Sequence, residues 1–225
     1  MLQHKNSGPY EAFFKRAIDI LVAISVMLVF SWLYIIIAVL VRVKLGSPVI
    51  FTQDRPGHID PKTGKERIFK LYKFRSMTDE RDENGELLPG SVRLTPFGAK
   101  LRASSLDELP EIWNIFNGDM SLIGPRPLAT IYLPYYTEEE RVRHTVRQGL
   151  TGLAQASGRN NLTWEEKFAY DVEYANNITF LMDVKIILKT IKVVLSHEGI
   201  GQGEQSPESF HIYRQRQLDQ MKEGK

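Results

Sequence analysis

Residues 20–41 read ILVAISVMLVFSWLYIIIAVLV, an apolar stretch of 22 residues that contains no charged side chain. As an α-helix this stretch would be about 33 Å long, while the hydrocarbon core of a bilayer is about 30 Å thick. A buried core helix in a chain of this size usually keeps a polar stripe, which is missing here. The stretch therefore predicts a membrane segment, and the organisation of the rest of the chain follows from it.

Basic residues flank the apolar stretch on both sides. Lys15 and Arg16 precede it, and Arg42 and Lys44 follow it. These flanks favour the cytoplasmic side for both ends, which a helical hairpin satisfies and a straight span does not. Ser31 lies at the middle and can bond back to a carbonyl one turn earlier, which bends a helix. We predict a re-entrant hairpin broken at Ser31, and the flanking charges alone leave a straight span open. A cleaved signal peptide is disfavoured because the apolar stretch is too long.

The composition narrows the class of protein further. The chain has 225 residues, of which 43% are hydrophobic and 25% charged, and it contains no cysteine. Disulfide frameworks, thiolate zinc sites and a cysteine nucleophile are therefore excluded. Residues 1–44 carry five basic and two acidic side chains, a net charge of +3, whereas residues 45–225 carry 24 basic and 25 acidic ones, a net charge of −1. This distribution argues against a nucleic-acid-binding surface.

The rest of the chain predicts a mixed α/β domain that is mostly helical. Short extended pieces are expected over 47–77, and regular strand–helix alternation is missing, so a doubly wound parallel sheet is not expected. Three later helices are predicted from their capping residues: Thr95 before 96–103, Thr163 before 164–176 and Asp183 at the start of 183–197. Helices 96–103 and 183–197 combine basic residues with an apolar face, so we expect them at a membrane surface. Residues 200–225 are predicted to form a polar tail.

The adjacent carboxylates Asp107 and Glu108 are the most suggestive local feature. With Ser105 as N-cap and Glu108 at N3, the pattern is that of a capping box opening a helix that extends to about Phe116. The positive end of such a helix keeps a carboxylate ionised and attracts phosphate. An ionised carboxylate can attack phosphorus while its neighbour holds Mg²⁺. Acidic residues at these positions also suit any capped helix, so the spacing alone leaves both interpretations open.

Two further stretches could bind phosphate. Gly124-Pro-Arg-Pro is a rigid turn that presents Arg126, and residues 147–159 contain three glycines and two arginines. Glycine-rich backbone beside arginine can cradle phosphates. By pattern alone the second stretch is more often an ordinary strand–turn–strand, and it matches neither a P-loop nor GxGxxG.

Several ordered motifs together make the sequence similar to a known family. It resembles the bacterial sugar transferases, the small monotopic polyprenyl-phosphate phosphoglycosyltransferases, over residues 14–200. The matching stretches are Lys15-Arg-Ala-Ile-Asp-Ile, Val49-Ile-Phe-Thr-Gln, Arg55-Pro-Gly, Tyr72-Lys-Phe-Arg-Ser-Met, Ser105-Leu-Asp-Glu-Leu-Pro, Asn114-Ile-Phe-Asn-Gly-Asp-Met-Ser, Gly124-Pro-Arg-Pro, Gly149-Leu-Thr-Gly-Leu-Ala-Gln and Gly158-Arg-Asn.

The resemblance implies an activity and a set of residues. The family transfers a sugar-1-phosphate from a UDP-sugar to polyprenyl phosphate and releases UMP, which starts glycoconjugate or polysaccharide assembly for downstream glycosyltransferases. It implies Asp107 as the nucleophile that forms a phosphosugar–aspartate intermediate, and Glu108, with Asp107, as the Mg²⁺-binding pair. It implies phosphate-binding roles for four basic residues: Lys73, Arg102, Arg126 and Arg159. Several negative charges meet at such a site, so Mg²⁺ and arginines are physically reasonable there.

The resemblance also implies an organisation of the chain. Residues 1–14 would be an N-terminal tail, 15–44 the re-entrant membrane helix, 45–199 the catalytic domain and 200–225 the polar C-terminal tail. The catalytic domain would face the cytoplasm on the inner membrane of a bacterium, in contact with membrane lipids. The family typically breaks its membrane helix at a Ser-Pro pair, whereas here Trp32 follows Ser31 and the main helix breaker is absent.

Two other functions remain as alternatives. A membrane-bound hydrolase of nucleotide-sugar pyrophosphate would use water in place of the lipid acceptor. A catalytically silent membrane scaffold of a polysaccharide assembly complex is the other, although the intact pair Asp107 and Glu108 argues against it. The sequence does not identify the sugar, the glycan pathway or the oligomeric state.

Overall fold

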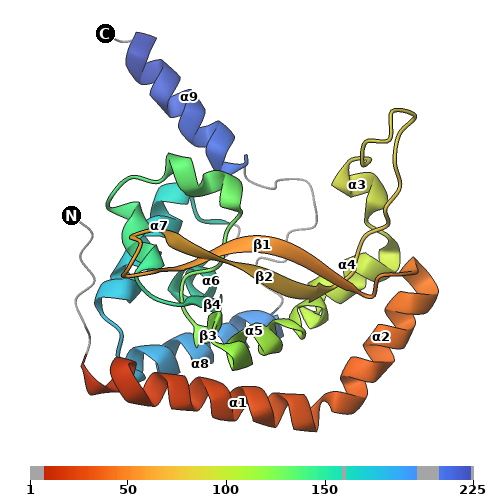
Figure 1. The fold of residues 1–225 in the computed structure, drawn as a ribbon, viewed down its shortest axis with the longest axis horizontal. Helices are drawn as coiled ribbons and strands as arrows, with labels where there is room; N and C mark the ends of the chain where they lie inside the picture. The colour runs from red at the N-terminus through yellow and green to blue at the C-terminus, as the bar shows by residue number, and fades with distance from the viewer. Residues whose placement is uncertain (1–7, 159–160, 197–207, 224–225) are drawn as a thin grey trace. The chain divides into compact units, whose positions relative to one another are not determined.

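A computed structural model describes residues 8–158, 161–196 and 208–223 of the chain. It confirms a mixed α/β fold that is mostly helical, with two small two-stranded sheets among the described residues (Figure 1). The chain forms two compact units, each built from several segments. The first unit contains Met1–Asp19, Asp54–Phe69 and Gly118–Lys225, and the second contains Ile20–Gln53 and Lys70–Asn117. We describe each unit by itself.

The predicted membrane segment forms two helices with a bend between them. Helix α1 spans Lys15–Val29 and α2 spans Ser31–Leu45, and the pair is bent by 65° at Phe30. The Ser31 hydroxyl donates to the Leu28 carbonyl at 3.0 Å, one turn earlier. Over the described residues, no individual helix has the length and apolar character to cross a bilayer, and this bent pair alone passes that test jointly.

Helix α2 buries one face against the second unit and exposes the other. Ile37 and Val41 form a cluster with Phe74 and Leu101. Ile37 and Val41 themselves are 4% and 0% exposed. The opposite face carries exposed large apolar residues: Trp32, Ile35, Ile36, Val39, Leu40 and Val43. Part of α2 is therefore a structural element of the second unit, while the described residues leave the rest of its apolar surface exposed.

Helix α4, Pro96–Ala103, forms where its capping residue predicted. The Thr95 hydroxyl accepts a hydrogen bond from the Gly98 amide at 3.1 Å, and Pro96 occupies the first turn. A Cβ atom at Gly98 would lie 1.8 Å from the Ser76 carbonyl oxygen, so only glycine permits this approach. The close contact places α4 directly against the chain that leaves β2.

The predicted capping box at Ser105 is wrong. Ser105 has a φ of 56° and makes no side-chain cap, because its backbone is left-handed rather than extended. A short 3₁₀ turn, η2, spans Leu106–Glu108, and the helix that follows, α5, begins only at Glu111 and ends at Asn117. Pro110 explains the delay, because proline is tolerated before a helix or in its first turn and lacks an amide donor.

A hairpin contributes strand residues to both units. Strand β1 spans Ile50–Ile59 and β2 spans Glu66–Phe74, and the turn between them is closed by the Asp60 amide donating to the Lys65 carbonyl at 2.9 Å. The chain then runs through the short helix α3, Gly90–Arg93, before reaching α4. The expected extended pieces over 47–77 are therefore present.

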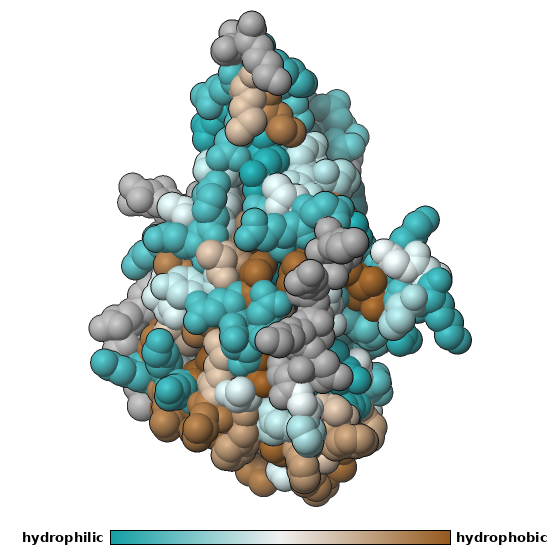
Figure 2. Space-filling view, turned by 90° about the vertical axis from the view of Figure 1, so that its left-hand side faces the viewer, coloured by the Kyte–Doolittle hydropathy of each residue, from teal (hydrophilic) through white to brown (hydrophobic). Residues whose placement is uncertain are grey.

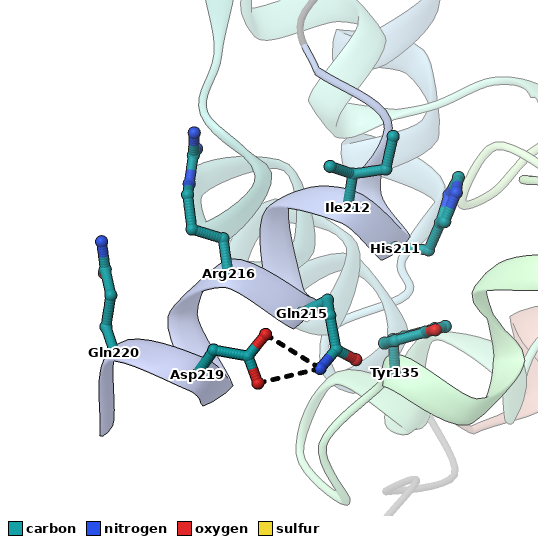
Figure 3. A pocket seen from close by; sticks show the side chains of 7 residues that line it. All are labelled: Tyr135, His211, Ile212, Gln215, Arg216, Asp219 and Gln220. Carbon is teal, nitrogen blue, oxygen red and sulfur yellow. Dashed lines mark hydrogen bonds between the residues drawn. The ribbon is translucent and has the colours of Figure 1, made fainter. Parts of the chain in front are cut away.

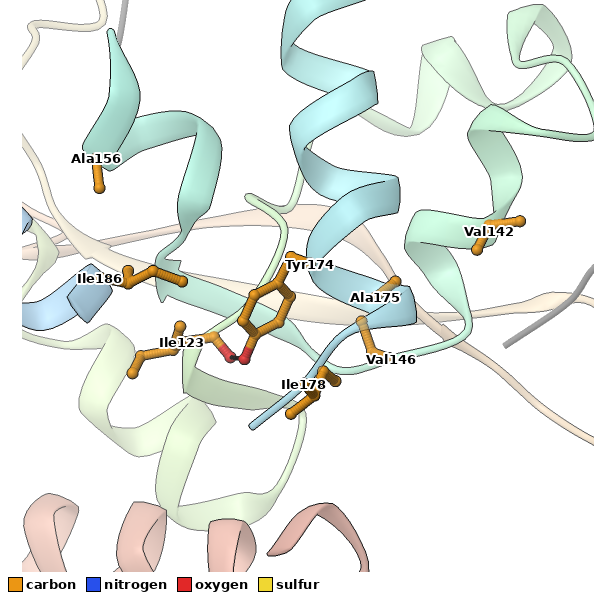
Figure 4. Close-up of a cluster of buried hydrophobic side chains, with 8 residues drawn as sticks. All are labelled: Ile123, Val142, Val146, Ala156, Tyr174, Ala175, Ile178 and Ile186. Carbon is orange, nitrogen blue, oxygen red and sulfur yellow. Dashed lines mark hydrogen bonds between the residues drawn. The ribbon is translucent and has the colours of Figure 1, made fainter. Parts of the chain in front are cut away.

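The first unit is built around a short parallel strand pair. Strands β3, Met120–Ile123, and β4, Gln148–Thr151, pair in register from Met120 with Gln148 to Ile123 with Thr151. Its other elements are η1 Tyr10–Phe14, η3 Thr130–Tyr135, η4 Glu140–His144, α6 Leu153–Ser157, α7 Trp164–Asn176, α8 Phe180–Ser196 and α9 Phe210–Glu223. Buried side chains of η4, α6, α7 and α8 meet at β3, where the Tyr174 hydroxyl donates to the Ile123 carbonyl at 3.0 Å (Figure 4).

The two predicted caps in this unit have different outcomes. Thr163 caps α7 in a complete capping box with Glu166, as predicted. Asp183 does not cap α8, because the helix already begins at Phe180. Its buried carboxylate instead accepts hydrogen bonds of 2.8 Å each from Tyr10, Lys15 and Tyr174. Asp183 therefore connects α8 to η1 and to the start of α1.

The predicted polar tail over 200–225 is wrong for residues 210–223, which form α9, while residues 197–207 lie outside the described part. Phe210 is fully buried against Tyr136 and Phe168. Arg214 of α9 pairs with Glu140, and the Trp164 indole donates to the Glu208 carbonyl at 2.9 Å. Tertiary contacts therefore hold a helix whose own sequence is largely polar.

Replacing Phe210 with Ala should therefore destabilise the first unit. We expect the free energy of unfolding to fall by about 3–5 kcal/mol, because a buried aromatic ring is lost and a cavity remains. Denaturant titration in detergent, followed by near-ultraviolet circular dichroism, measures the change. Met221→Ala, on the exposed end of the same helix, is the control and should change stability by about 0.5 kcal/mol or less. Equal stabilities of the two variants would contradict the anchoring role of Phe210.

The first unit also exposes an apolar surface formed by η1 and α8. Phe13 and Phe14 are 74% and 61% exposed, and Phe180 and Leu181 are 54% and 69% exposed. The Tyr10 and Phe180 rings lie 5.7 Å apart, so the two elements are neighbours. Figure 2 shows hydrophobic residues gathered at the lower end of the face turned to the viewer. Such a patch suits contact with an apolar phase.

Candidate active site

The two adjacent carboxylates lie on a turn that packs against α2, part of the predicted membrane segment. Asp107 is 7% exposed, and the η2 turn that carries it is preceded by the left-handed Ser105. Leu106 and Leu109, on either side of the dyad, pack against the cluster that contains Ile37 and Val41 of α2. The dyad is therefore held rigidly beside the helix predicted to enter the lipid.

Lys73 links the dyad to a third carboxylate. Its ammonium lies 2.7 Å from Glu108 Oε1 and 3.1 Å from Glu111 Oε1. The Glu111 side chain is only 2% exposed, and a buried carboxylate needs a cationic partner to remain ionised. Lys73 thus neutralises part of the negative charge of Glu108 and Glu111. The sequence reasoning did not single out Glu111, although its position four residues after Asp107 was a usable signal.

An asparagine clamp explains why Lys73 meets these carboxylates. Asn114 of α5 accepts a hydrogen bond from the Tyr72 amide at 3.1 Å and donates to the Lys70 carbonyl at 2.7 Å. The side chain is fully buried, so both bonds form without competition from water. Because the clamp joins α5 to the end of β2, Lys73 is held opposite the turn that carries Glu108.

Arg102 lies in the same unit as the dyad. Its Nε donates to the Ser76 hydroxyl at 2.8 Å, and the residue is exposed at the end of α4. This bond uses one donor of the guanidinium, which has five in all. Four of the predicted site residues, Asp107, Glu108, Lys73 and Arg102, are therefore placed in the second unit.

Arg126 lies in the first unit, on the turn that follows β3. The Gly124 amide donates to the Thr151 carbonyl and the Gly149 amide to the Pro125 carbonyl, both at 2.9 Å. A Cβ atom at Gly149 would lie 2.1 Å from the Gly124 amide nitrogen, so glycine permits this close approach. The turn is therefore fixed by backbone bonds to β4. Arg159, the remaining predicted arginine, lies outside the described residues.

The donor set of the dyad fits a magnesium ion. Magnesium prefers hard oxygen ligands and is usually bound by one or two protein carboxylates together with substrate phosphates. Asp107 and Glu108 supply two adjacent carboxylates. Within the described ranges, no group of three or more His, Cys, Asp or Glu side chains is placed to hold a metal ion.

A cavity of about 480 Å³ lies elsewhere, between Tyr135 and one side of α9 (Figure 3). Its lining includes His211 and Gln215, and the amide of Gln215 donates to both oxygens of Asp219. The predicted site residues do not line it. This cavity is therefore not the candidate active site.

Comparison with known proteins defines the class. Residues 10–197 match the family described as bacterial sugar transferase, so the match covers most of the chain. The chain belongs to this family, and it is an enzyme of the sugar phosphotransferase class. The expected resemblance is thereby confirmed.

Individual relatives add detail about similar chains. The chain is 49% identical to the uncharacterized sugar transferase EpsL of Bacillus subtilis (strain 168), over 84% of this chain and 90% of the relative. It is 36% identical to UDP-N-acetylgalactosamine-undecaprenyl-phosphate N-acetylgalactosaminephosphotransferase of Aeromonas hydrophila, over 85% of this chain but 46% of the relative. It is 35% identical to undecaprenyl-phosphate galactose phosphotransferase of Salmonella typhimurium, over 83% of this chain and 41% of the relative. The chain thus spans less than half of these two longer relatives.

Proposed function

We propose that this protein transfers a sugar-1-phosphate from a UDP-sugar to undecaprenyl phosphate and releases UMP. The observation that carries the proposal is the turn with the buried Asp107 and the partly exposed Glu108. This turn packs against the predicted membrane helix through Leu106 and Leu109, and Lys73 is bound to Glu108. A site that uses a soluble donor and a lipid acceptor has to lie at the membrane surface. The names of the relatives support the same two substrates.

In the proposed mechanism Asp107 is the nucleophile. A carboxylate oxygen attacks the phosphorus that carries the sugar, an aspartyl phosphate bond forms, and the bond to the UMP oxygen breaks. In the second step an oxygen of undecaprenyl phosphate attacks the same phosphorus, and the Asp107 carboxylate leaves. Both steps use one site in turn, which suits substrates from different phases. Burial reduces the hydration of the nucleophile, which strengthens electrostatic interactions inside the site.

We propose Glu108, together with Asp107, as the residues that hold Mg²⁺. When bound, the ion would neutralise charge on the diphosphate and on the departing UMP. Lys73 can remain paired with Glu111 when Glu108 takes another cation, so the lysine stays close to the reacting phosphate. Arg102, Arg126 and Arg159 are proposed to bind phosphate oxygens, for which the forked guanidinium is well suited.

The proposed location is the cytoplasmic face of the inner membrane of a bacterium. The bent pair α1 and α2 would enter the bilayer and return to the same face, and the apolar surface of η1 and α8 would lie on it. Lys185, Lys189 and Lys192 on α8 would approach anionic lipid headgroups. The donor UDP-sugar is a cytoplasmic metabolite in this scheme, and membrane lipids are direct contacts.

Single-cysteine labelling tests the hairpin, since the chain has no cysteine of its own. Gln3→Cys and Lys44→Cys should both react with a membrane-impermeant maleimide only after the cytoplasmic face is opened. That result would place both ends on one side, which the basic flanks favour. Labelling of the two cysteines from opposite sides would show a straight span and remove the hairpin.

The decisive experiment measures UMP release from a panel of UDP-sugars, with and without undecaprenyl phosphate. We expect release that requires the lipid and one preferred sugar. Release that is indifferent to the lipid would instead show the nucleotide-sugar hydrolase. No release across a broad panel, by folded and membrane-bound protein, would favour the silent scaffold.

A further inference from the structure

Arg143 is a fully buried arginine that the proposed mechanism does not use. It lies on η4 and is 0% exposed. Its Nε donates to Asp171 Oδ2 at 2.9 Å, and its Nη2 lies at the same distance from that oxygen. Asp171 comes from the middle of α7 and is itself 3% exposed. The two elements are thus joined by an ion pair that water does not reach.

A second bond of Arg143 reaches the turn that carries Arg126. Its Nη2 also donates to the carbonyl oxygen of Arg126 at 2.6 Å, a short charge-assisted hydrogen bond. Arg126 stands between Pro125 and Pro127, whose rings restrict the backbone on both sides. The backbone bonds described above fix Gly124 and Pro125 to β4. Arg143 fixes the next residue, which is the one that carries the proposed phosphate-binding side chain.

The surroundings leave the Arg143 guanidinium little freedom. It lies over the rings of Tyr136 and Phe168, with distances of 5.6 and 5.7 Å to the ring centroids. Although burial acts to lower it, Asp171 raises the pKa of Arg143, so the side chain stays charged. Burial and then Arg143 lower the pKa of neighbouring His144 well below its usual value, so that imidazole adds no competing charge. The donor aimed at Arg126 is therefore permanently charged and immobile.

A purely structural ion pair would not need this arrangement. Well-packed apolar residues of similar volume often replace a buried ion pair at no cost in stability. They could not donate a hydrogen bond to the Arg126 carbonyl. The hydrogen bond to the Arg126 carbonyl is therefore a contribution of the charged pair that apolar packing cannot replace.

We propose that Arg143 and Asp171 are positioning residues, which hold the Gly124–Pro127 turn so that the Arg126 side chain meets the phosphates of the substrate. The inference rests on the proposed function of Arg126. Asp171 acts through Arg143, and Arg143 acts through the backbone of Arg126. Neither residue is expected to touch substrate.

A double-mutant cycle tests this positioning. In the otherwise unchanged enzyme, Arg126→Ala should lower kcat/KM for the UDP-sugar by about 100-fold, as for the loss of one charge-stabilising donor. In the background Arg143→Met with Asp171→Leu, which replaces the pair with apolar residues, Arg126→Ala should cost about tenfold or less, because the turn is already displaced. Equal costs in the two backgrounds would overturn the inference, since loss of folded enzyme alone would leave the ratio unchanged.

Arg141→Met provides the matched control. Arg141 lies on the same η4 turn and pairs with Glu66 at 2.9 Å, so its loss also removes an ion pair of the first unit. In this background Arg126→Ala should still lower kcat/KM for the UDP-sugar by about 100-fold. A reduced cost here would show that any damage to η4 produces the effect, which would also overturn the inference.

Hydrogen exchange separates this inference from the proposed function. The amides of Ile123, Gly124, Arg126 and Leu128 should exchange about tenfold faster or more in the Arg143→Met, Asp171→Leu variant than in Arg141→Met, because the turn opens locally. If Arg126→Ala leaves the unchanged enzyme fully active, the role of Arg126 fails while faster exchange still supports positioning of the turn. Unchanged exchange would overturn the positioning.

If the variant with the apolar pair does not fold, Arg143→Lys replaces it in both measurements, since one ammonium does not reproduce the forked geometry of the guanidinium.

Discussion

Replacing Asp107 with Asn is expected to lower kcat for transfer by at least about 10⁴-fold, as for the loss of a covalent nucleophile. The amide has the shape of the carboxylate but cannot form the aspartyl phosphate, so binding of the donor should change little. Asp107 is 7% exposed on a turn packed against α2, and an isosteric change keeps that packing. The measurement is UMP release at saturating UDP-sugar and undecaprenyl phosphate.

Asp79→Asn is the matched control, because Asp79 lies in the same unit but has a side chain that is 61% exposed. It should keep its activity. The covalent step has its own readout: incubation with UDP-sugar alone should add the mass of one sugar phosphate to the peptide that contains Asp107. Full turnover by the Asn variant, or an adduct on another peptide, would remove Asp107 as nucleophile.

Replacing Glu108 with Gln should be the second largest effect. We expect kcat to fall by about 10²–10³-fold, the usual cost of losing one electrostatic stabiliser of the transition state. Gln lacks the charge that would hold Mg²⁺ and that pairs with Lys73 at 2.7 Å, so the lysine should shift toward Glu111. Titration of activity with Mg²⁺ should show a half-saturating concentration at least about tenfold higher than in the unchanged enzyme.

Chelation provides the companion measurement. Removal of divalent cations should abolish transfer, and Mg²⁺ should restore it in the unchanged enzyme. Glu83→Gln, in the exposed loop before α3, is the control and should keep the original Mg²⁺ dependence. An unchanged Mg²⁺ response in Glu108→Gln would contradict the assignment of Glu108 to the metal site. Activity without divalent cations would contradict the requirement for a metal ion.

Features with a local cause could be predicted from the sequence. The uncharged run over 20–41 indicated a long apolar helical segment, which the pair α1 and α2 forms. Thr95 and Thr163 indicated two helix starts, because capping depends on residues within one turn. The Asp107–Glu108 pair stood out because adjacent carboxylates are visible without a structure. The backbone of Ser105 could not be predicted, because its left-handed conformation opposes the usual preference of a serine.

Features with distant causes were missed. Helix α9 depends on Phe210 entering an aromatic cluster made by residues 42 or more positions earlier in the chain, so its polar local sequence indicated a tail. Arg143 is buried only because Asp171, 28 positions later, accepts its charge. Asp183 resembled a helix cap, although its partners include Tyr10 and Lys15 from the other end of the chain.

The cluster that joins α2 to the η2 turn makes the predicted membrane segment part of a folded core. Ile37 and Val41 are core residues of the second unit as much as Phe74 and Leu101 are. A fragment without residues 1–44 would lose half of that core and expose the other half to water, beside the turn that carries Asp107 and Glu108. Trimming the chain would therefore remove folding energy from the second unit together with the predicted membrane segment.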